Sequence, residues 1–141
     1  LETSTAKYKF VFTHHVLGTG RGGVELAGGY EWGDVAHLAA HRPGWDQTIQ
    51  QVMAANHVTI FFQGHDHIFV KQELDGVIYQ TLPEPANPNY SWENEDSYQS
   101  GDKLPNSGHL RVTVTPAGVI VEYVRSFLDQ PDEVAFSYTV E

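Results

Sequence analysis

An apolar run that ends in a pair of histidines is the feature that most constrains the fold. The segment Val58–Phe62 (VTIFF) is continuously apolar and leads directly into Gly64-His65-Asp66-His67. It follows an expected amphipathic helix over 45–56, in which the apolar residues recur at helical spacing. A short apolar run after a helix is typical of a strand buried on both faces of a mixed sheet. The sequence therefore predicts an α/β fold.

A second, shorter strand is expected upstream, and it also ends in histidine. The run Lys9–Thr13 (KFVFT) is aromatic and β-branched and stops at His14 and His15, before a glycine-rich loop. A short helix is expected over 34–41, before Pro43. If the two strands are parallel neighbours, the histidines that follow them meet at one edge of the sheet, where α/β folds place their sites.

The remainder of the chain is predicted to be β-rich. Asp75-Gly76 indicates a hairpin between strands over 68–73 and 77–81. The segment 82–108 contains four prolines and is too long for an ordinary connection, which predicts a flap beside an active site. An antiparallel meander should then cover 109–141, with strands over 109–115, 119–125 and 134–140.

Size and composition indicate one domain and exclude several classes of protein. The chain has 141 residues and 40% hydrophobic residues, enough for a single core. It has no cysteine, so a metal would need His, carboxylate or amide ligands. The formal net charge of −10 argues against nucleic-acid binding. No apolar run is long enough to cross a membrane, and a Pro- and Asn-rich chain without cysteine favours an extracytoplasmic origin.

The histidines themselves suggest a metal site. His65 and His67 are two residues apart in a segment expected to be extended, so both imidazoles should project to the same side. Neutral imidazole suits borderline divalent metals. His14 occupies the equivalent place after the other strand, and two parallel strands would bring His14, His65 and His67 together.

This arrangement resembles the last two motifs of the calcineurin-like metallophosphoesterases, the superfamily of purple acid phosphatases and bacterial phosphodiesterases. The similarity lies in a strand followed by Thr13-His14-His15, a helix, and an apolar strand followed by Gly64-His65-Asp66-His67. It covers residues 9–81 well and the β-rich tail only in general character. The resemblance implies the C-terminal half of an α/β/β/α sandwich, with residues 1–141 as one partial domain.

The resemblance also implies a site and a reaction. His14 and His65 would hold one metal and His67 a second, the two being divalent or trivalent ions of the Mn, Fe, Zn, Mg or Co class. The substrate would be a phosphate mono- or diester. His15 would contact substrate or protonate the leaving group, and Arg21 would bind a phosphate through its planar guanidinium. Asp66 would point away from the metals and hydrogen-bond within the protein.

The family also needs three earlier motifs, which are Asp-x-His, Gly-Asp and Gly-Asn-His, and none of them precedes His14. The resemblance therefore implies a companion segment or chain that supplies them. Two other interpretations are open. One is a cupin-like enzyme with a single metal, held by the His-x-His pair and Glu73. The other is a β-rich binding or assembly module without catalytic activity, because a fold does not by itself imply an activity.

Overall fold

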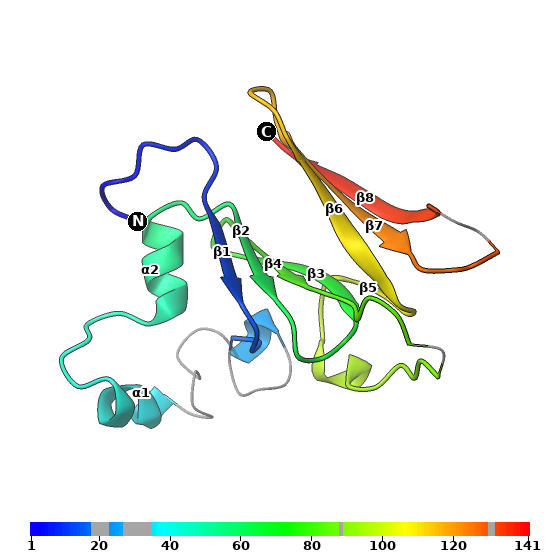
Figure 1. Cartoon of the computed structure of the whole chain (residues 1–141). Coiled ribbons are helices and arrows are strands. Elements are labelled where there is room, and N and C mark those ends of the chain that lie inside the picture. Colours follow the sequence, from blue (N-terminus) through cyan, green and yellow to red (C-terminus); the bar gives the residue numbers. More distant parts are fainter. Residues whose placement is uncertain (18–22, 27–34, 88, 130–131) are drawn as a thin grey trace.

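The computed structural model of this chain contains two β-sheets with helices beside one of them (Figure 1). It describes residues 1–17, 23–26, 35–87, 89–129 and 132–141. Helix α2 covers one face of a five-stranded sheet, and a three-stranded sheet covers the other face. The predicted α/β class is confirmed.

The five-stranded sheet contains the two strands that precede the histidines. Its order is β1-β2-β4-β3-β5, and β1 (Phe10–Thr13), β2 (Ile60–Gln63) and β4 (Val77–Thr81) are parallel. The two strands are therefore parallel neighbours, which is the condition under which the histidines that follow them could meet. All four residues of β2 are buried, as expected for a strand covered on both faces.

The hairpin β3–β4 forms where the sequence predicts it. Strand β3 (Phe69–Leu74) runs antiparallel to β4, and Leu74 is paired with Val77. The two turn residues, Asp75 and Gly76, both have positive φ, at 50° and 77°. This geometry is the one that an Asp-Gly turn favours between twisted strands.

Helix α2 (Ile49–Ala55) is shorter than the predicted helix over 45–56 because a capping box fixes its start. The Thr48 hydroxyl accepts a hydrogen bond from the Gln51 amide at 3.1 Å, and the Gln51 side chain accepts one from the Thr48 amide at 2.9 Å. Met53 then packs with Phe61 and Tyr79 of the sheet. Helix α1 (Val35–His41) agrees with the short helix expected over 34–41, apart from Asp34, which lies outside the described residues.

The three-stranded sheet is the predicted meander. Its strands β6 (Gly108–Val114), β7 (Val119–Arg125) and β8 (Val134–Val140) are antiparallel in that order. A second core lies between the sheets, where the side chains of Ile60, Phe62 and Ile78 contact those of Val119 and Val121. We call the side of each sheet that faces the other its inner face.

The segment 82–108 contains more structure than a flap was expected to have. It includes a 3₁₀ turn, η2 (Glu95–Ser97), and strand β5 (Asp102–Leu104), which pairs with β3 and adds an edge to the larger sheet. A second 3₁₀ turn, η1 (Val24–Leu26), follows β1. In the part of the chain that the structure describes, no helix is long and apolar enough to span a membrane.

Candidate metal centre

The parallel pairing of β1 and β2 aligns the residues that follow the two strands. The last aligned pair is Thr13 and Gln63, so His14 and Gly64 stand opposite each other. The Gly64 amide donates a hydrogen bond to the His14 carbonyl at 3.0 Å. A β-carbon at position 64 would lie only 3.2 Å from that carbonyl oxygen, so glycine permits this close approach.

Three histidines lie together at this strand edge: His14, His15 and His65. Each offers one ring nitrogen, and the three nitrogens lie within 4.8 Å of one another. The ring centroids are 5.4 Å apart for His14 and His65, and 4.8 Å apart for His15 and His65. His14 and His15 are exposed and His65 is half-buried, so the group faces solvent from one side. We call these three residues the histidine cluster.

The cluster differs from the predicted ligand set in one residue. His14 and His65 meet as expected, but the structure places His15 with them and leaves His67 outside the group. The expectation that residues 65–67 are extended is wrong. His65 and His67 have left-handed φ values of 72° and 57°, so the two-residue alternation of a strand does not apply.

Asp66 stabilises the turn at residues 64–67 from its buried side, in the structural role expected for it. Its side chain is buried, and its Oδ2 accepts a hydrogen bond from the Tyr98 hydroxyl at 2.7 Å. The Asp66 amide donates to the Gly64 carbonyl at 2.9 Å. Tyr98 is also buried, which places a charge-assisted hydrogen bond in an apolar surrounding formed with Ile68 and Val70.

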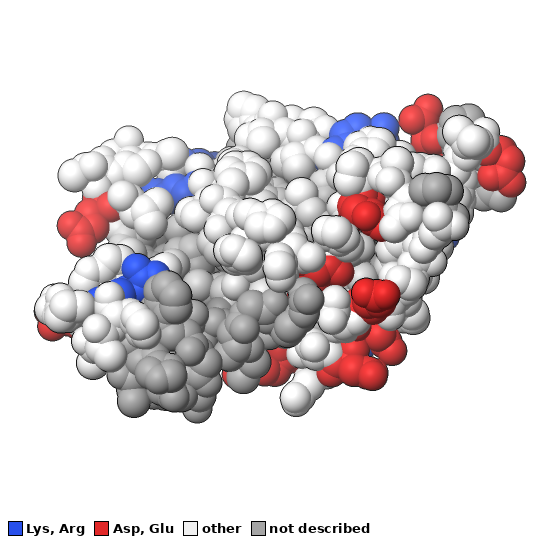
Figure 2. All heavy atoms as spheres, turned by 60° about the horizontal axis from the view of Figure 1, so that its bottom comes forward, with Lys and Arg blue, Asp and Glu red and all other residues white. Residues whose placement is uncertain are grey.

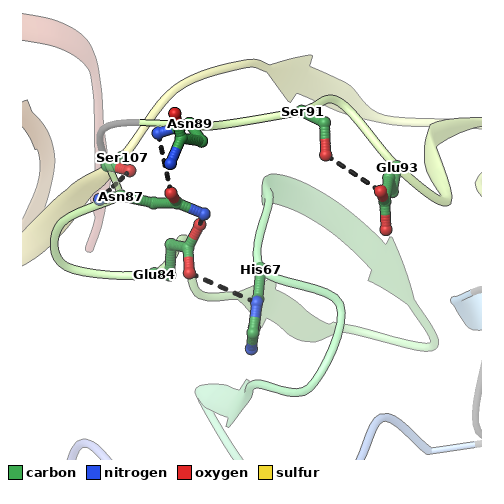
Figure 3. A network of polar contacts seen from close by, with 7 residues as sticks. All are labelled: His67, Glu84, Asn87, Asn89, Ser91, Glu93 and Ser107. Carbon is green, nitrogen blue, oxygen red and sulfur yellow. Dashed lines mark hydrogen bonds and ion pairs between the residues drawn. The ribbon is translucent and has the colours of Figure 1, made fainter.

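His67 belongs to a separate polar network, shown in Figure 3. Its Nδ1 lies 3.4 Å from Glu84 Oε2, and the other oxygen of Glu84 accepts a hydrogen bond from the Asn87 side chain. The Asn87 amide in turn donates to the Ser107 hydroxyl at 3.0 Å. Glu84 therefore contacts Nδ1 of the His67 ring, and the second ring nitrogen, Nε2, is not part of this contact.

A polar pocket of about 310 Å³ adjoins both the cluster and this network. Among the described residues, no Lys, Arg or large apolar side chain lines it; the described lining residues are His65, Asp66, His67, Glu84, Asn87, Ser91, Glu93 and Asn94. Figure 2, which brings the bottom of Figure 1 forward, shows acidic side chains gathered on the right half of this face and only scattered Lys and Arg. The described surroundings of the site therefore favour cations.

The base of the glycine-rich loop is tied to the larger sheet by a second network. Gln72 donates to the Glu25 carboxylate at 3.1 Å and accepts from the Val24 amide at 3.2 Å. Partial burial alone would raise the pKa of Glu25, but hydrogen bonds, chiefly from the Ser100 hydroxyl at 2.6 Å, outweigh it and lower the pKa. The Glu25 carboxylate therefore serves as an ionised hydrogen-bond acceptor and not as a proton donor.

Two further residues were named from the sequence. Arg21, the predicted phosphate ligand, is outside the described residues. Glu73, the carboxylate that a cupin-like site would use, is exposed on β3 and lines a different pocket, together with Lys7, His57 and Tyr138. None of the clustered histidines lines that pocket, so the structure gives the cupin-like interpretation no support.

Glu84 and Tyr98 were not singled out in the sequence. Glu84 lies three residues after β4, at the same strand edge as the histidines, and this position is a signal that could have found it. Tyr98 reaches Asp66 from 32 residues away through an irregular loop, and no local pattern indicates that contact.

Comparison with known proteins gives a fold relationship and no family. No family model and no curated protein matches the chain. Among solved structures, the chain is similar to one described as "GAP50 the anchor in the inner membrane complex of Plasmodium", with 13% identity and a TM-score of 0.59. The match covers 96% of this chain and 36% of that chain. At this identity the similarity shows the fold alone, and this chain spans little more than a third of the other's length.

Proposed function

We propose that this chain is the C-terminal part of a calcineurin-like metallophosphoesterase, and that it hydrolyses phosphate mono- or diesters when a companion segment completes its site. The α/β/β/α sandwich of that family is the fold we propose for the whole assembly. The observation that carries the proposal is the histidine cluster, in which three ring nitrogens from two parallel strand ends lie within 4.8 Å of one another.

The chemistry of the donors fits a metal ion. Imidazole nitrogen is a good ligand for Zn²⁺, Fe²⁺, Co²⁺ and Mn²⁺, and three such donors on one side leave further positions open. A bound ion of this kind supplies Lewis acidity to a phosphoryl oxygen and lowers the pKa of a water. The solvent-facing side of the cluster gives a substrate room to approach.

The histidines of this chain would have different roles in the reaction. His14 and His65, fixed by the Gly64 hydrogen bond, would hold the first ion. His15 would contact the substrate or give a proton to its leaving group, because its ring is 4.8 Å from that of His65. His67 would hold a second ion through the ring nitrogen that Glu84 does not contact, since a carboxylate on one nitrogen orients a ligating histidine.

The test is metal affinity and hydrolysis in His65→Ala. We expect a loss of Zn²⁺ affinity of at least about tenfold, the size of effect that even outer-shell changes produce. Hydrolysis of bis(4-nitrophenyl) phosphate by the completed assembly should be abolished. The matched control is His109→Ala, because His109 is an exposed histidine on β6 and the cluster does not include it. If His65→Ala leaves both the Zn²⁺ affinity and the hydrolysis unchanged, the proposal is wrong.

The role of His15 needs its own variant, His15→Gln. If His15 acts on the substrate, the variant should keep most of its Zn²⁺ affinity and lose turnover. If His15 is instead a third ligand, the affinity should fall as far as it does in His65→Ala. Isothermal titration and steady-state kinetics on the same preparations separate the two roles.

A second candidate function is a binding or assembly module without catalytic activity. The observation that favours it is the similarity to a structure that is described as an anchor. This candidate predicts that the completed assembly leaves phosphate esters intact whether or not the cluster binds metal, so the hydrolysis assay above decides between the two functions.

A further inference from the structure

A further pocket adjoins the polar pocket at Asn87, which lines both of them. Its volume is about 570 Å³, within the range that is typical of small-molecule sites. Three segments form it: the loop after β4, the residues just before β6 and the residues just after β7. Its described lining residues are Ala86, Asn87, Tyr90, Asn106, Ser107, Ser126, Phe127 and Leu128. We call it the aromatic pocket, after Tyr90 and Phe127.

Hydrogen bonds between these three segments hold the walls of the aromatic pocket in place. The Ser126 hydroxyl donates to the Pro85 carbonyl at 2.7 Å, and the Ser126 amide donates to the Ser107 carbonyl at 3.1 Å. On the other side, the Asn87 amide donates to the Ser107 hydroxyl at 3.0 Å, as Figure 3 shows. The pocket is therefore formed before a ligand arrives, and binding need order few groups.

The apolar side chains of the aromatic pocket keep surface that a ligand can cover. Leu128 lines the pocket and is fully exposed, and Phe127 is half-buried. Tyr90 is also half-buried and packs against the buried cluster that contains Tyr98, which fixes one wall of the pocket. A ligand here would remove leucine and aromatic surface from water, and this favours an apolar group, above all an aromatic ring.

The charges around the two pockets select a neutral ligand. Among the described residues, no Lys or Arg lines either pocket. The Arg125 guanidinium lies 5.7 Å from the centre of the Phe127 ring, but it is paired with Glu133 at 3.3 Å. Glu84 and Glu93 line the polar pocket, so an additional anionic group on a ligand would be repelled there.

We propose that the aromatic pocket binds the alcohol portion of the phosphate ester. This alcohol is neutral, polar next to the phosphorus and aromatic at its far end. The inference rests on the proposed function, since it names the substrate class of that site. With the phosphoryl group at the histidine cluster, the polar part of the alcohol lies in the polar pocket and its ring passes Asn87 into the aromatic pocket. Hydrolysis breaks the bond from phosphorus to the alcohol oxygen, water supplies the new oxygen on phosphorus, and the alcohol leaves with a proton.

The first test is a titration of the ¹⁵N-labelled chain with 2-naphthol, a neutral aromatic alcohol, followed through the amide chemical shifts. We expect saturable shifts at the amides of Ser107, Ser126 and Leu128, which line the aromatic pocket. The amides of Lys71 and Glu73, which line the separate pocket beside Tyr138, should not shift. Glycerol at the same concentrations should shift none of these amides, because it is neutral but has no aromatic surface.

Leu128→Ser should weaken the binding of 2-naphthol by about tenfold or more, the effect that even one methylene group has in an apolar pocket. The matched control is Leu1→Ser, the same change at another exposed leucine, which lines neither pocket. Both leucines are exposed, so both variants should fold, and equal Tm values check this. In the completed assembly, Leu128→Ser should raise KM for 2-(2-naphthyloxy)ethyl phosphate by a similar factor and leave KM for ethyl phosphate unchanged.

Three outcomes would overturn the inference. They are no saturable shift at the three pocket amides, equal affinity for 2-naphthol in Leu128→Ser and Leu1→Ser, and equal changes of KM for the two esters. Failure of the proposed function is distinguishable, because 2-naphthol carries no phosphate and its binding needs no metal. An assembly that binds 2-naphthol as expected and leaves both esters intact keeps the pocket and removes its role in hydrolysis. Hydrolysis without binding of 2-naphthol would keep the hydrolase and remove the pocket.

Discussion

The buried hydrogen bond beneath the histidine turn can be tested with two chemically identical substitutions. Tyr98→Phe removes the hydroxyl that donates to Asp66 at 2.7 Å. Tyr79→Phe removes a hydroxyl that is equally buried but has no hydrogen-bond partner among the described residues. Both tyrosines are 1% exposed, so the two variants lose the same atom from the same degree of burial.

The structure predicts a large difference between these variants. A hydrogen bond to a charged group contributes about 1.5–3 kcal/mol to the free energy of unfolding, and Tyr98→Phe should lose that amount. Tyr79→Phe should change the free energy by less than about 0.5 kcal/mol or stabilise the fold, because burying an unpaired hydroxyl is unfavourable. For a chain of this size, about 2 kcal/mol corresponds to a fall in Tm of roughly 4–10 °C.

Urea unfolding followed by circular dichroism, together with calorimetric Tm, measures both variants. Tyr98→Phe should also weaken Zn²⁺ binding, because Asp66 lies between His65 and His67 and its contact with Tyr98 holds their turn. A double-mutant cycle with Asp66→Asn isolates the pair. Equal loss of stability in Tyr98→Phe and Tyr79→Phe would refute the reasoning, and so would a coupling energy near zero.

Two further predictions follow from burial and close contact. Burial raises the pKa of Tyr123 to about 12, above its ordinary value of about 10, so the stability this group contributes is present below about pH 10 and is lost as the pH rises through 12. Urea midpoints should therefore fall over this interval, and the fall should be smaller in Tyr123→Phe; an identical pH profile would contradict this cause. Gly64→Ala would place a methyl group 3.2 Å from the His14 carbonyl oxygen and should reduce Zn²⁺ affinity. Its control is Gly118→Ala, which approaches the Val140 carbonyl at 3.0 Å at a site remote from the cluster and should reduce stability alone; equal affinity in both variants would contradict the positioning role of Gly64.

The sequence predicted most strands because their patterns are strong and local. The buried run before Gly64, the Asp75-Gly76 turn and the alternating tail each indicate one structure. The start of α2 was set too early, although the capping box of Thr48 and Gln51 is visible in the sequence. Strand β5 was missed because three residues, Asp102–Leu104, are too few to show a periodicity, and their pairing with β3 exists only in the folded chain.

The sequence could predict only the part of the candidate site that the ends of the parallel strands position. Parallel pairing brings His14 and His65 together, and the sequence contains that information. The position of His67 depends on left-handed φ values at two non-glycine residues, which are sparsely populated and need tertiary contacts to persist. The contact of Tyr98 with Asp66 is one such contact, made from a distant loop.

Electrostatics predicts how many metal ions the isolated chain can hold at its cluster. Imidazole donors are neutral when they ligate, so an ion bound at the histidine cluster would keep its double positive charge. A second dication about 4 Å away would be repelled by roughly 16 kcal/mol at an effective dielectric constant of 20, four times the value for unit charges. A bridging anion would offset such a repulsion. Of the acidic residues described near the site, Asp66 is buried against the Tyr98 hydroxyl, and Glu84 and Glu93 line the pocket on the His67 side.

The isolated chain should therefore bind one Zn²⁺ at the cluster, and a second ion only when a companion contributes a carboxylate. Isothermal titration of the isolated chain should give a single site, which His65→Ala removes and His109→Ala keeps. A second site of comparable affinity in the isolated chain, lost together with the first in His65→Ala, would show that the described residues can hold a dinuclear centre unaided. The need for a carboxylate from outside the chain would then disappear.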